Sequence, residues 1–181
     1  MQRAIVVPPA PAPEALAELK QWLALTGPRE DAALERLIGA ALELCEGFTG
    51  QMPLEATCEE VLAATDGWQW LTTRPIQAVV AIEGVPAEGA RFALASDAYM
   101  LELDPDGGGR IRVTRPGAAG RVAVRFVAGL APTWADLPES LRHGVIRLAA
   151  HQHRSRETGV ADPVPPAAVA ALWRPWRIVR L

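Results

Sequence analysis

Hydrophobic residues recur at helical spacing in two long stretches of the chain, residues 29–48 and 137–157. The first has acidic residues in its opening turn, where the helix dipole favours them, and Gly47 and Gly50 near its end. The second opens with Pro138 and Glu139, which suit a first helical turn. Both therefore predict long helices. The apolar stripe of the first consists of Leu34, Leu37, Ile38, Ala41, Leu42, Cys45 and Phe48, so we interpret Cys45 as a buried hydrophobe rather than a reactive thiol.

Shorter patterns lie towards both ends of the chain. Residues 14–25 predict a short helix with one apolar face, made of Leu16, Leu19, Trp22 and Leu23, and residues 167–173 predict one or two further helical turns. Residues 1–13 are rich in proline, which predicts an extended arm, and the residues after 173 predict an extended tail.

Between the long helices the pattern changes to that of short strands. We expect strands near residues 59–63, 68–71, 76–82, 99–103, 110–114 and 121–127. Asp66 and Gly67 predict a hairpin turn between the first two strands, and residues 104–109 predict a hairpin loop. The apolar run 76–82 suits a strand buried on both faces, whereas Val122, Val124 and Phe126 alternate onto one face.

These elements predict an α+β protein whose 181 residues form a single domain. Its helical core has two long helices and a short one, with an inserted antiparallel β module and extended N- and C-terminal arms. The expected parts are an arm at 1–13, helices within 14–50, the β module at 57–128, a long helix at 137–157, and a C-terminal helix and tail at 165–181.

Composition narrows the class of protein. Half of the residues are hydrophobic and 22% are charged, which excludes a mainly disordered chain. No stretch is long and apolar enough to suggest a membrane span, and the N-terminal apolar run is too short for a signal peptide. Two cysteines cannot form a disulfide scaffold, so we expect a reducing, cytosolic setting.

Charge is distributed unevenly along the chain, whose formal net charge is −3. Residues 1–66 carry four basic and eleven acidic side chains, residues 67–136 carry seven of each, and residues 137–181 carry seven arginines and three acids. An acidic front and a basic back suggest surfaces for head-to-tail association. The negative total argues against a general nucleic-acid coat.

The sequence offers no pattern typical of catalysis, cofactor binding or metal binding. Its only glycine run, residues 107–109, lies between two predicted strands and lacks the helix N-terminus that binds phosphate. The histidines at 143, 151 and 153 do not have the spacing of a helical metal site. No serine lies in a nucleophile elbow, and Asp104 and Asp106 fit a turn. We therefore expect neither an enzyme nor a bound cofactor.

The C-terminal tail combines tryptophan with arginine, the side chains most enriched at binding hot spots. Three interpretations of this apolar, basic segment stay open: packing on the chain's own core, docking into a neighbouring subunit or partner, and nucleic-acid binding. The residues concerned are Trp173, Arg174, Trp176, Arg177, Ile178, Val179, Arg180 and Leu181.

Three stretches together resemble the head–tail connector (head-completion adaptor) family of tailed bacteriophages and gene transfer agents. They are the acidic-start helix 31–50, the residues from Val124 to Leu130 with the following helix that contains Leu137–Leu141 and Leu148–His151, and the ending 165–181. Together they span most of the chain in the order expected for the family.

The resemblance implies a structural protein without an active site. It would form a ring, commonly of twelve subunits, beneath the portal protein at the head–tail junction of a phage or phage-like particle assembled in the bacterial cytoplasm. A tail-side completion (stopper) protein would attach below, and DNA would pass through the lumen without specific binding. The tail would anchor the ring to the portal through Trp173, Arg174, Trp176, Arg177, Ile178, Arg180 and Leu181. The alternative is a small nucleic-acid-binding module that uses the same Arg/Trp-rich C-terminus.

Overall fold

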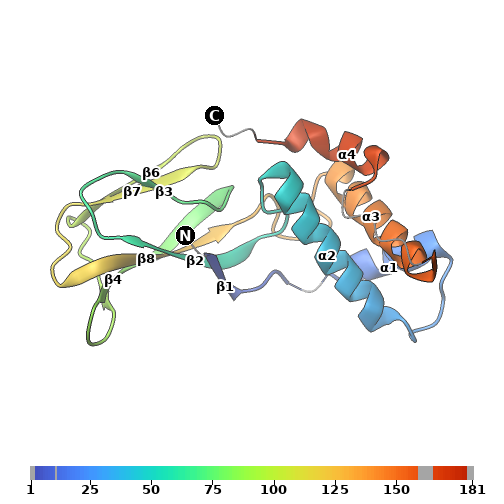
Figure 1. Ribbon diagram of the computed structural model, residues 1–181, viewed down its shortest axis with the longest axis horizontal. Helices are drawn as coiled ribbons and strands as arrows, with labels where there is room; N and C mark the ends of the chain where they lie inside the picture. The colour runs from blue at the N-terminus through green and yellow to red at the C-terminus, as the bar shows by residue number, and fades with distance from the viewer. Residues whose placement is uncertain (1–2, 11, 159–164, 179–181) are drawn as a thin grey trace. The chain divides into compact units, whose positions relative to one another are not determined.

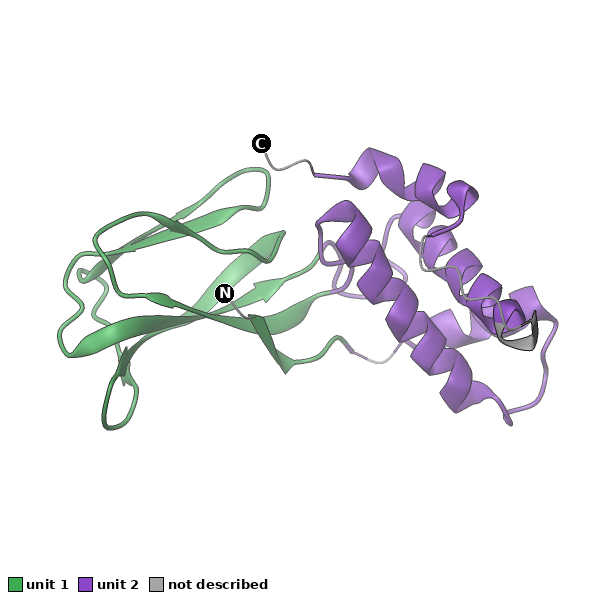
Figure 2. Cartoon of the chain, viewed as in Figure 1, with its two compact units in different colours: residues 1–9, 55–129 green, residues 10–54, 130–181 purple. Residues whose placement is uncertain are grey.

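The computed structural model describes residues 3–10, 12–158 and 165–178, and the chain divides into two compact units (Figures 1 and 2). Residues 1–9 and 55–129 make up the β unit, and residues 10–54 and 130–181 make up the helical unit. Helices and antiparallel sheets are thus both present, which confirms the predicted α+β class.

The helical unit contains the elements predicted from the 3.6-residue period. Its helices are α1 (Pro13–Leu23), α2 (Asp31–Thr49), α3 (Glu139–Thr158) and α4 (Ala167–Trp173). α4 continues into the 3₁₀ turn η1 (Arg174–Trp176), so the prediction of an extended tail directly after residue 173 is wrong for these three residues. The apolar stripe of α2 packs against that of α3, with α1 and α4 completing a single core. α2 ends at Gly50, whose φ of +74° is a left-handed conformation that suits glycine.

One side chain of the apolar face of α1 stays largely outside the core. α1 buries Ala15 and Leu19 completely, but Trp22 remains 46% exposed. Trp22 lies on the same face of α1 as the buried Ala15 and Leu19, about 20° from Ala15 around the helix, but it belongs to the last turn of α1.

The β unit consists of two antiparallel sheets. The larger has the order β1-β2-β8-β4-β5, and the smaller has the order β3-β7-β6. The strands of the larger sheet are β1 (Arg3–Val7), β2 (Ala56–Ala63), β8 (Ala119–Ala128), β4 (Ile76–Pro86) and β5 (Phe92–Ala93). Those of the smaller sheet are β3 (Gln69–Trp70), β7 (Gly109–Val113) and β6 (Tyr99–Leu103). Residues 3–7, expected within an extended arm, are extended and form an edge strand.

Two expectations for the strands are confirmed. β6 and β7 form the predicted hairpin, in which Tyr99 pairs with Val113 and Leu103 with Gly109. In β8, Val122, Val124 and Phe126 are completely buried, as their alternation indicated. Together with buried residues of β2, β4 and β7 they form the core of the β unit.

Two other expectations are wrong. β2 does not form a hairpin with β3 across Asp66 and Gly67; it lies between β1 and β8, and all eight of its residues pair with β8. A two-residue β3 could not satisfy the backbone of so long a strand. β4 is not buried on both faces, since Val80 is 60% exposed, because an antiparallel sheet packs one face on the core and turns the other to solvent.

A buried carboxylate holds the segment that follows β3. Glu60 of β2 is completely buried and accepts hydrogen bonds from the backbone N–H and the hydroxyl of both Thr72 and Thr73, at 2.7–3.1 Å. Such a charge is tolerated in a core only when its oxygens are well supplied with donors. Within the described ranges, no helix is long and apolar enough to cross a membrane.

Candidate functional site

The C-terminal segment begins with a tryptophan that belongs to the core. Trp173 is completely buried, and its indole Nε1–H donates to the carbonyl oxygen of Leu141 in α3 at 3.3 Å. Its ring lies 6.0 Å from that of Phe48 in α2. A Cβ on Gly144 would lie only 2.1 Å from the indole nitrogen, so glycine is needed there for the ring to reach α3. Trp173 therefore fastens α4 to α3 and has no surface left for a partner.

The next residues are also tied to the helical unit. The indole N–H of Trp176, which is half-buried, donates to the Ser140 hydroxyl at 2.8 Å. The backbone N–H of Ile178 donates to the carbonyl oxygen of Thr49 at 2.8 Å. The segment therefore follows the surface of α2 and α3 as far as the structure describes it, which supports packing on the chain's own core for this part of the tail.

The two arginines of the same segment point outward. Arg174 and Arg177 are exposed, and the Arg177 guanidinium lies 5.7 Å from the centre of the Phe48 ring. Neither forms an ion pair with any other described residue. The predicted site thus divides into a buried Trp173, a half-buried Trp176 and two exposed arginines. Arg180 and Leu181, which were also predicted to belong to it, lie outside the described residues.

A groove lies between α1 and the first half of α3, both in the helical unit. Its volume is about 440 Å³, and it is lined mainly by Glu18, Gln21, Trp22, Glu139, Arg142 and His143. The exposed Trp22 meets the His143 ring edge to face, with ring centres 5.4 Å apart. The Arg142 guanidinium lies 3.7 Å from the Glu18 carboxylate and 3.4 Å from the Glu139 carboxylate, so Arg142 bridges the two acids.

Sequence reasoning missed this groove because Trp22 fitted a core stripe and the three histidines showed no motif. The sequence carried no signal for it, because Trp22 shares the face of α1 that buries Ala15 and Leu19. Glu18 also accepts a hydrogen bond from the indole of Trp134 at 3.2 Å, so its carboxylate is held in place.

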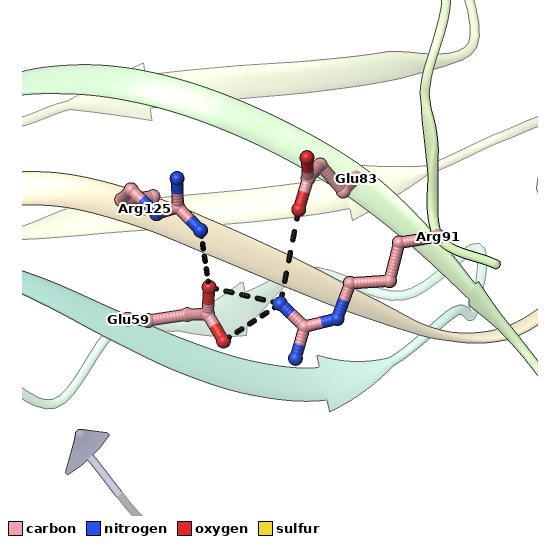
Figure 3. Close-up of polar contacts among 4 residues, drawn as sticks. All are labelled: Glu59, Glu83, Arg91 and Arg125. Atoms are coloured by element: carbon pink, nitrogen blue, oxygen red, sulfur yellow. Dashed lines mark hydrogen bonds and ion pairs between the residues drawn. The ribbon is translucent and has the colours of Figure 1, made fainter. Parts of the chain in front are cut away.

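The β unit carries a cluster of ion pairs across three strands of its larger sheet (Figure 3). Glu59 of β2 lies 2.9 Å from Arg91 and 3.2 Å from Arg125 of β8, and Arg91 also lies 3.7 Å from Glu83 of β4. Burial alone would raise the pKa of Glu59, but hydrogen bonds and charge from Arg91 and Arg125 together hold it below its usual value. The cluster fastens the segment between β4 and β5 to the sheet.

The tryptophans of the smaller sheet are stacked with arginine. The Arg110 guanidinium lies 4.8 Å from the ring centre of Trp68 and 5.5 Å from that of Trp70, and it pairs with Glu102 on the opposite strand. Arg112 pairs with Asp66 at 2.7 Å, and this hydrogen bond lowers the pKa of Asp66. Each of these cations is neutralised by an acid of the same unit.

The remaining candidates for chemistry are structural. Cys45 is completely buried and burial raises its pKa to about 12, which confirms a hydrophobic role, since only a thiolate is a good nucleophile. His153 contacts Glu30 at 2.8 Å, and His151 is exposed. Among the described residues, no three histidine, cysteine or acidic side chains are grouped as a metal ion would require. Residues 104–109 form the predicted turn, with Gly107 at a φ of +79° against Pro75.

Comparison with known proteins gives matches among solved structures. The chain matches no protein-family model, and no curated protein is significantly similar to it in sequence. It is similar to a chain in the neck of an empty GTA (gene transfer agent) particle computed with C6 symmetry, with a TM-score of 0.79 and 30% identity. It is also similar to chains of the virion of a native gene transfer agent particle (TM-score 0.75, 31% identity) and of the neck of a native GTA particle computed with C12 symmetry (0.78, 29%). Each alignment covers 100% of this chain and 97% of the other.

Proposed function

Because the chain belongs to the head–tail connector family of gene transfer agent and phage particles, we propose that it forms a twelve-subunit ring beneath the portal protein. Its role as a structural connector at the neck, between capsid and tail, follows from membership of the family. The observation that carries this function is the match over the whole chain, since both units, and not the helices alone, have counterparts in a neck protein.

Symmetry supports the ring. Necks of related particles were computed with C6 and with C12 symmetry, and twelve copies would satisfy both. A ring needs heterologous contacts, in which one face of a subunit binds a different face of the next and the rotation closes. We propose that the two units act together as one adaptor domain over residues 1–181, without catalytic activity.

The nucleic-acid-binding alternative is not supported. Trp173 is buried and Trp176 half-buried, so they do not offer the open stacking platform that bases require. The arginines that stack on Trp68 and Trp70, Arg110 and Arg74, are already paired with acids. We propose instead that DNA passes through the lumen without specific contacts, as the net charge of −3 favours.

For the portal contact we propose the very end of the chain, from Ile178 to Leu181. The buried Trp173 and the hydrogen-bonded Trp176 would hold the residues just before this end on the helical unit. Arg180 would supply charge, and Ile178 and Leu181 would supply apolar contact. A tail-side completion protein would bind the opposite face of the ring.

Two shortened chains test the portal contact. Removal of residues 179–181 should leave the thermal stability of the protein unchanged and abolish its binding to purified portal. Removal of residues 173–181 should destabilise the helical unit, because it also deletes Trp173. Full portal binding by the chain that lacks 179–181 would contradict the proposed anchor.

Electron microscopy tests the function as a whole. Particles made without this protein should have filled heads and no attached tails, and supply of the protein should restore a ring between portal and tail. A neck that assembles normally without it would overturn the proposal.

A further inference from the structure

The α1–α3 groove has the chemistry of a receptor for an arginine side chain. It combines the half-exposed indole of Trp22 with the carboxylates of Glu18 and Glu139. A guanidinium can stack on an aromatic ring and pair with a carboxylate at the same time, whereas a lysine ammonium is less suited to both. Arg142 already pairs with both acids from within the groove.

Charge in the groove remains unbalanced. Of the charged residues that line it, two are acids and one is a base. The side chain of Glu139 is 91% exposed, so most of its carboxylate surface is open to a second cation despite the contact with Arg142. The groove therefore favours a cationic partner.

The exposed turn at the end of α4 has the complementary chemistry. Arg174, Pro175 and Arg177 are exposed on a short 3₁₀ turn whose backbone is held by Trp173 on one side and Trp176 on the other. Both arginines lack an ion-pair partner among the described residues. A rigid turn with outward arginines loses little conformational freedom on binding.

Groove and turn lie on opposite sides of α3, which prevents them from meeting within one chain. α3 faces the groove with Arg142, His143 and Ile146, and it faces α4 and η1 with Ser140, Leu141 and Gly144. At about 100° per residue, the two sets are separated by roughly 160° around the helix. Figure 1 shows α1 and α4 flanking α3 accordingly.

We propose that the α1–α3 groove of one subunit binds the Arg174–Arg177 turn of a second copy of this chain. Because the groove and the turn lie on opposite sides of α3, each subunit can use its groove for one neighbour and its turn for the other. This is the heterologous contact that a closed ring requires. The inference rests on the proposed ring and adds its subunit interface: Arg174, which unlike Arg177 does not stack on Phe48, stacks on Trp22 and pairs with Glu139 of the neighbour.

Cross-linking in assembled particles tests this interface. The variant that combines Gln21→Cys with Arg174→Cys places thiols on the rim of the groove and on the turn, at two exposed positions. The native Cys45 and Cys58 are buried and should not react. A short bis-maleimide reagent should then give a ladder of covalent multimers on denaturing gels, and each single variant should give none.

A matched pair controls for general proximity in the ring. Arg36→Cys replaces another exposed arginine of the helical unit, on α2, and is combined with the same Arg174→Cys. Particles with normal necks that yield no ladder from the groove pair would overturn the interface while the proposed ring stands. An equally strong ladder from the α2 pair would also overturn it. Absence of this protein from the neck would instead refute the proposed function.

Charge reversal provides a second measurement. Glu139→Arg should reduce the yield of tailed particles at least tenfold, because it places two arginines against the arginines of the neighbour. Combination with Arg174→Glu should restore most of the yield, since the pair is then re-formed with opposite sign. Equal defects in the single and double variants would overturn the pairing.

Discussion

The two units of this protein differ in which of their arginines form ion pairs. In the β unit six arginines form ion pairs with acids of the same unit, as Arg91 does with Glu59: Arg74, Arg91, Arg110, Arg112, Arg115 and Arg125. In the helical unit, Arg147, Arg154, Arg174 and Arg177 have no such partner among the described residues. Most arginines of the β unit are thus already paired, and this difference supports the contact between helical units that we propose above.

The units also differ in the interactions that hold their cores together. The helical unit is closed by apolar packing, in which Trp173 near the end of the chain fills the space above Gly144. The β unit is closed partly by polar groups, since the buried Glu60 holds the backbone of Thr72 and Thr73. Apolar packing makes the helical unit sensitive to lost side-chain volume, and the buried carboxylate makes the β unit sensitive to lost hydrogen bonds.

The largest expected effect comes from emptying the helical core. Trp173→Ala should lower the free energy of unfolding by about 3–5 kcal/mol, because it removes a completely buried indole. The control Trp22→Ala, at a half-exposed position, should cost less than about 1 kcal/mol. Denaturant unfolding measures both. Similar losses in the two variants would mean that Trp173 does not fasten α4, and hydrogen exchange should show the damage in the helical unit alone.

The next largest effect comes from the buried carboxylate of the β unit. Glu60→Ala should destabilise by about 1–3 kcal/mol, because the backbone donors of Thr72 and Thr73 lose their acceptor. Glu102→Ala, which removes one partner of an ion pair at the surface, should cost less than about 1 kcal/mol. Faster amide exchange at residues 72 and 73 would locate the effect, and unchanged exchange there would contradict it.

A smaller effect distinguishes the units by pH. The pKa of Glu59 is lowered in the folded protein, so its ion pairs stabilise the β unit above the ordinary glutamate pKa of about 4.3, and this contribution is lost as pH falls through the lowered value. Amide exchange should therefore accelerate in β2, β4 and β8 below about pH 4. In Glu59→Gln the stability of the β unit should be lower at neutral pH and should change less with acid. An unaltered pH dependence would show that the cluster in Figure 3 contributes nothing to stability.

The sequence by itself determined the features of this protein that depend on residues close together in the chain. The stripe of α2, the β6–β7 hairpin and the burial of Cys45 follow from the 3.6-residue period, from turn chemistry and from alternation, all of which act over a few residues. The order of such features along the chain is also the basis of the resemblance to connector proteins, which the solved structures bear out.

Only the tertiary structure decided the features that join distant residues. β2 pairs with β1 and β8 rather than with β3, because a long strand needs a partner that can satisfy its whole backbone. Trp173 is core rather than surface because Gly144, 29 positions earlier, leaves room for it. The groove exists because the packing of α1 on α3 leaves Trp22 outside. Burial depends on which elements meet, and a pattern within one element does not contain that information.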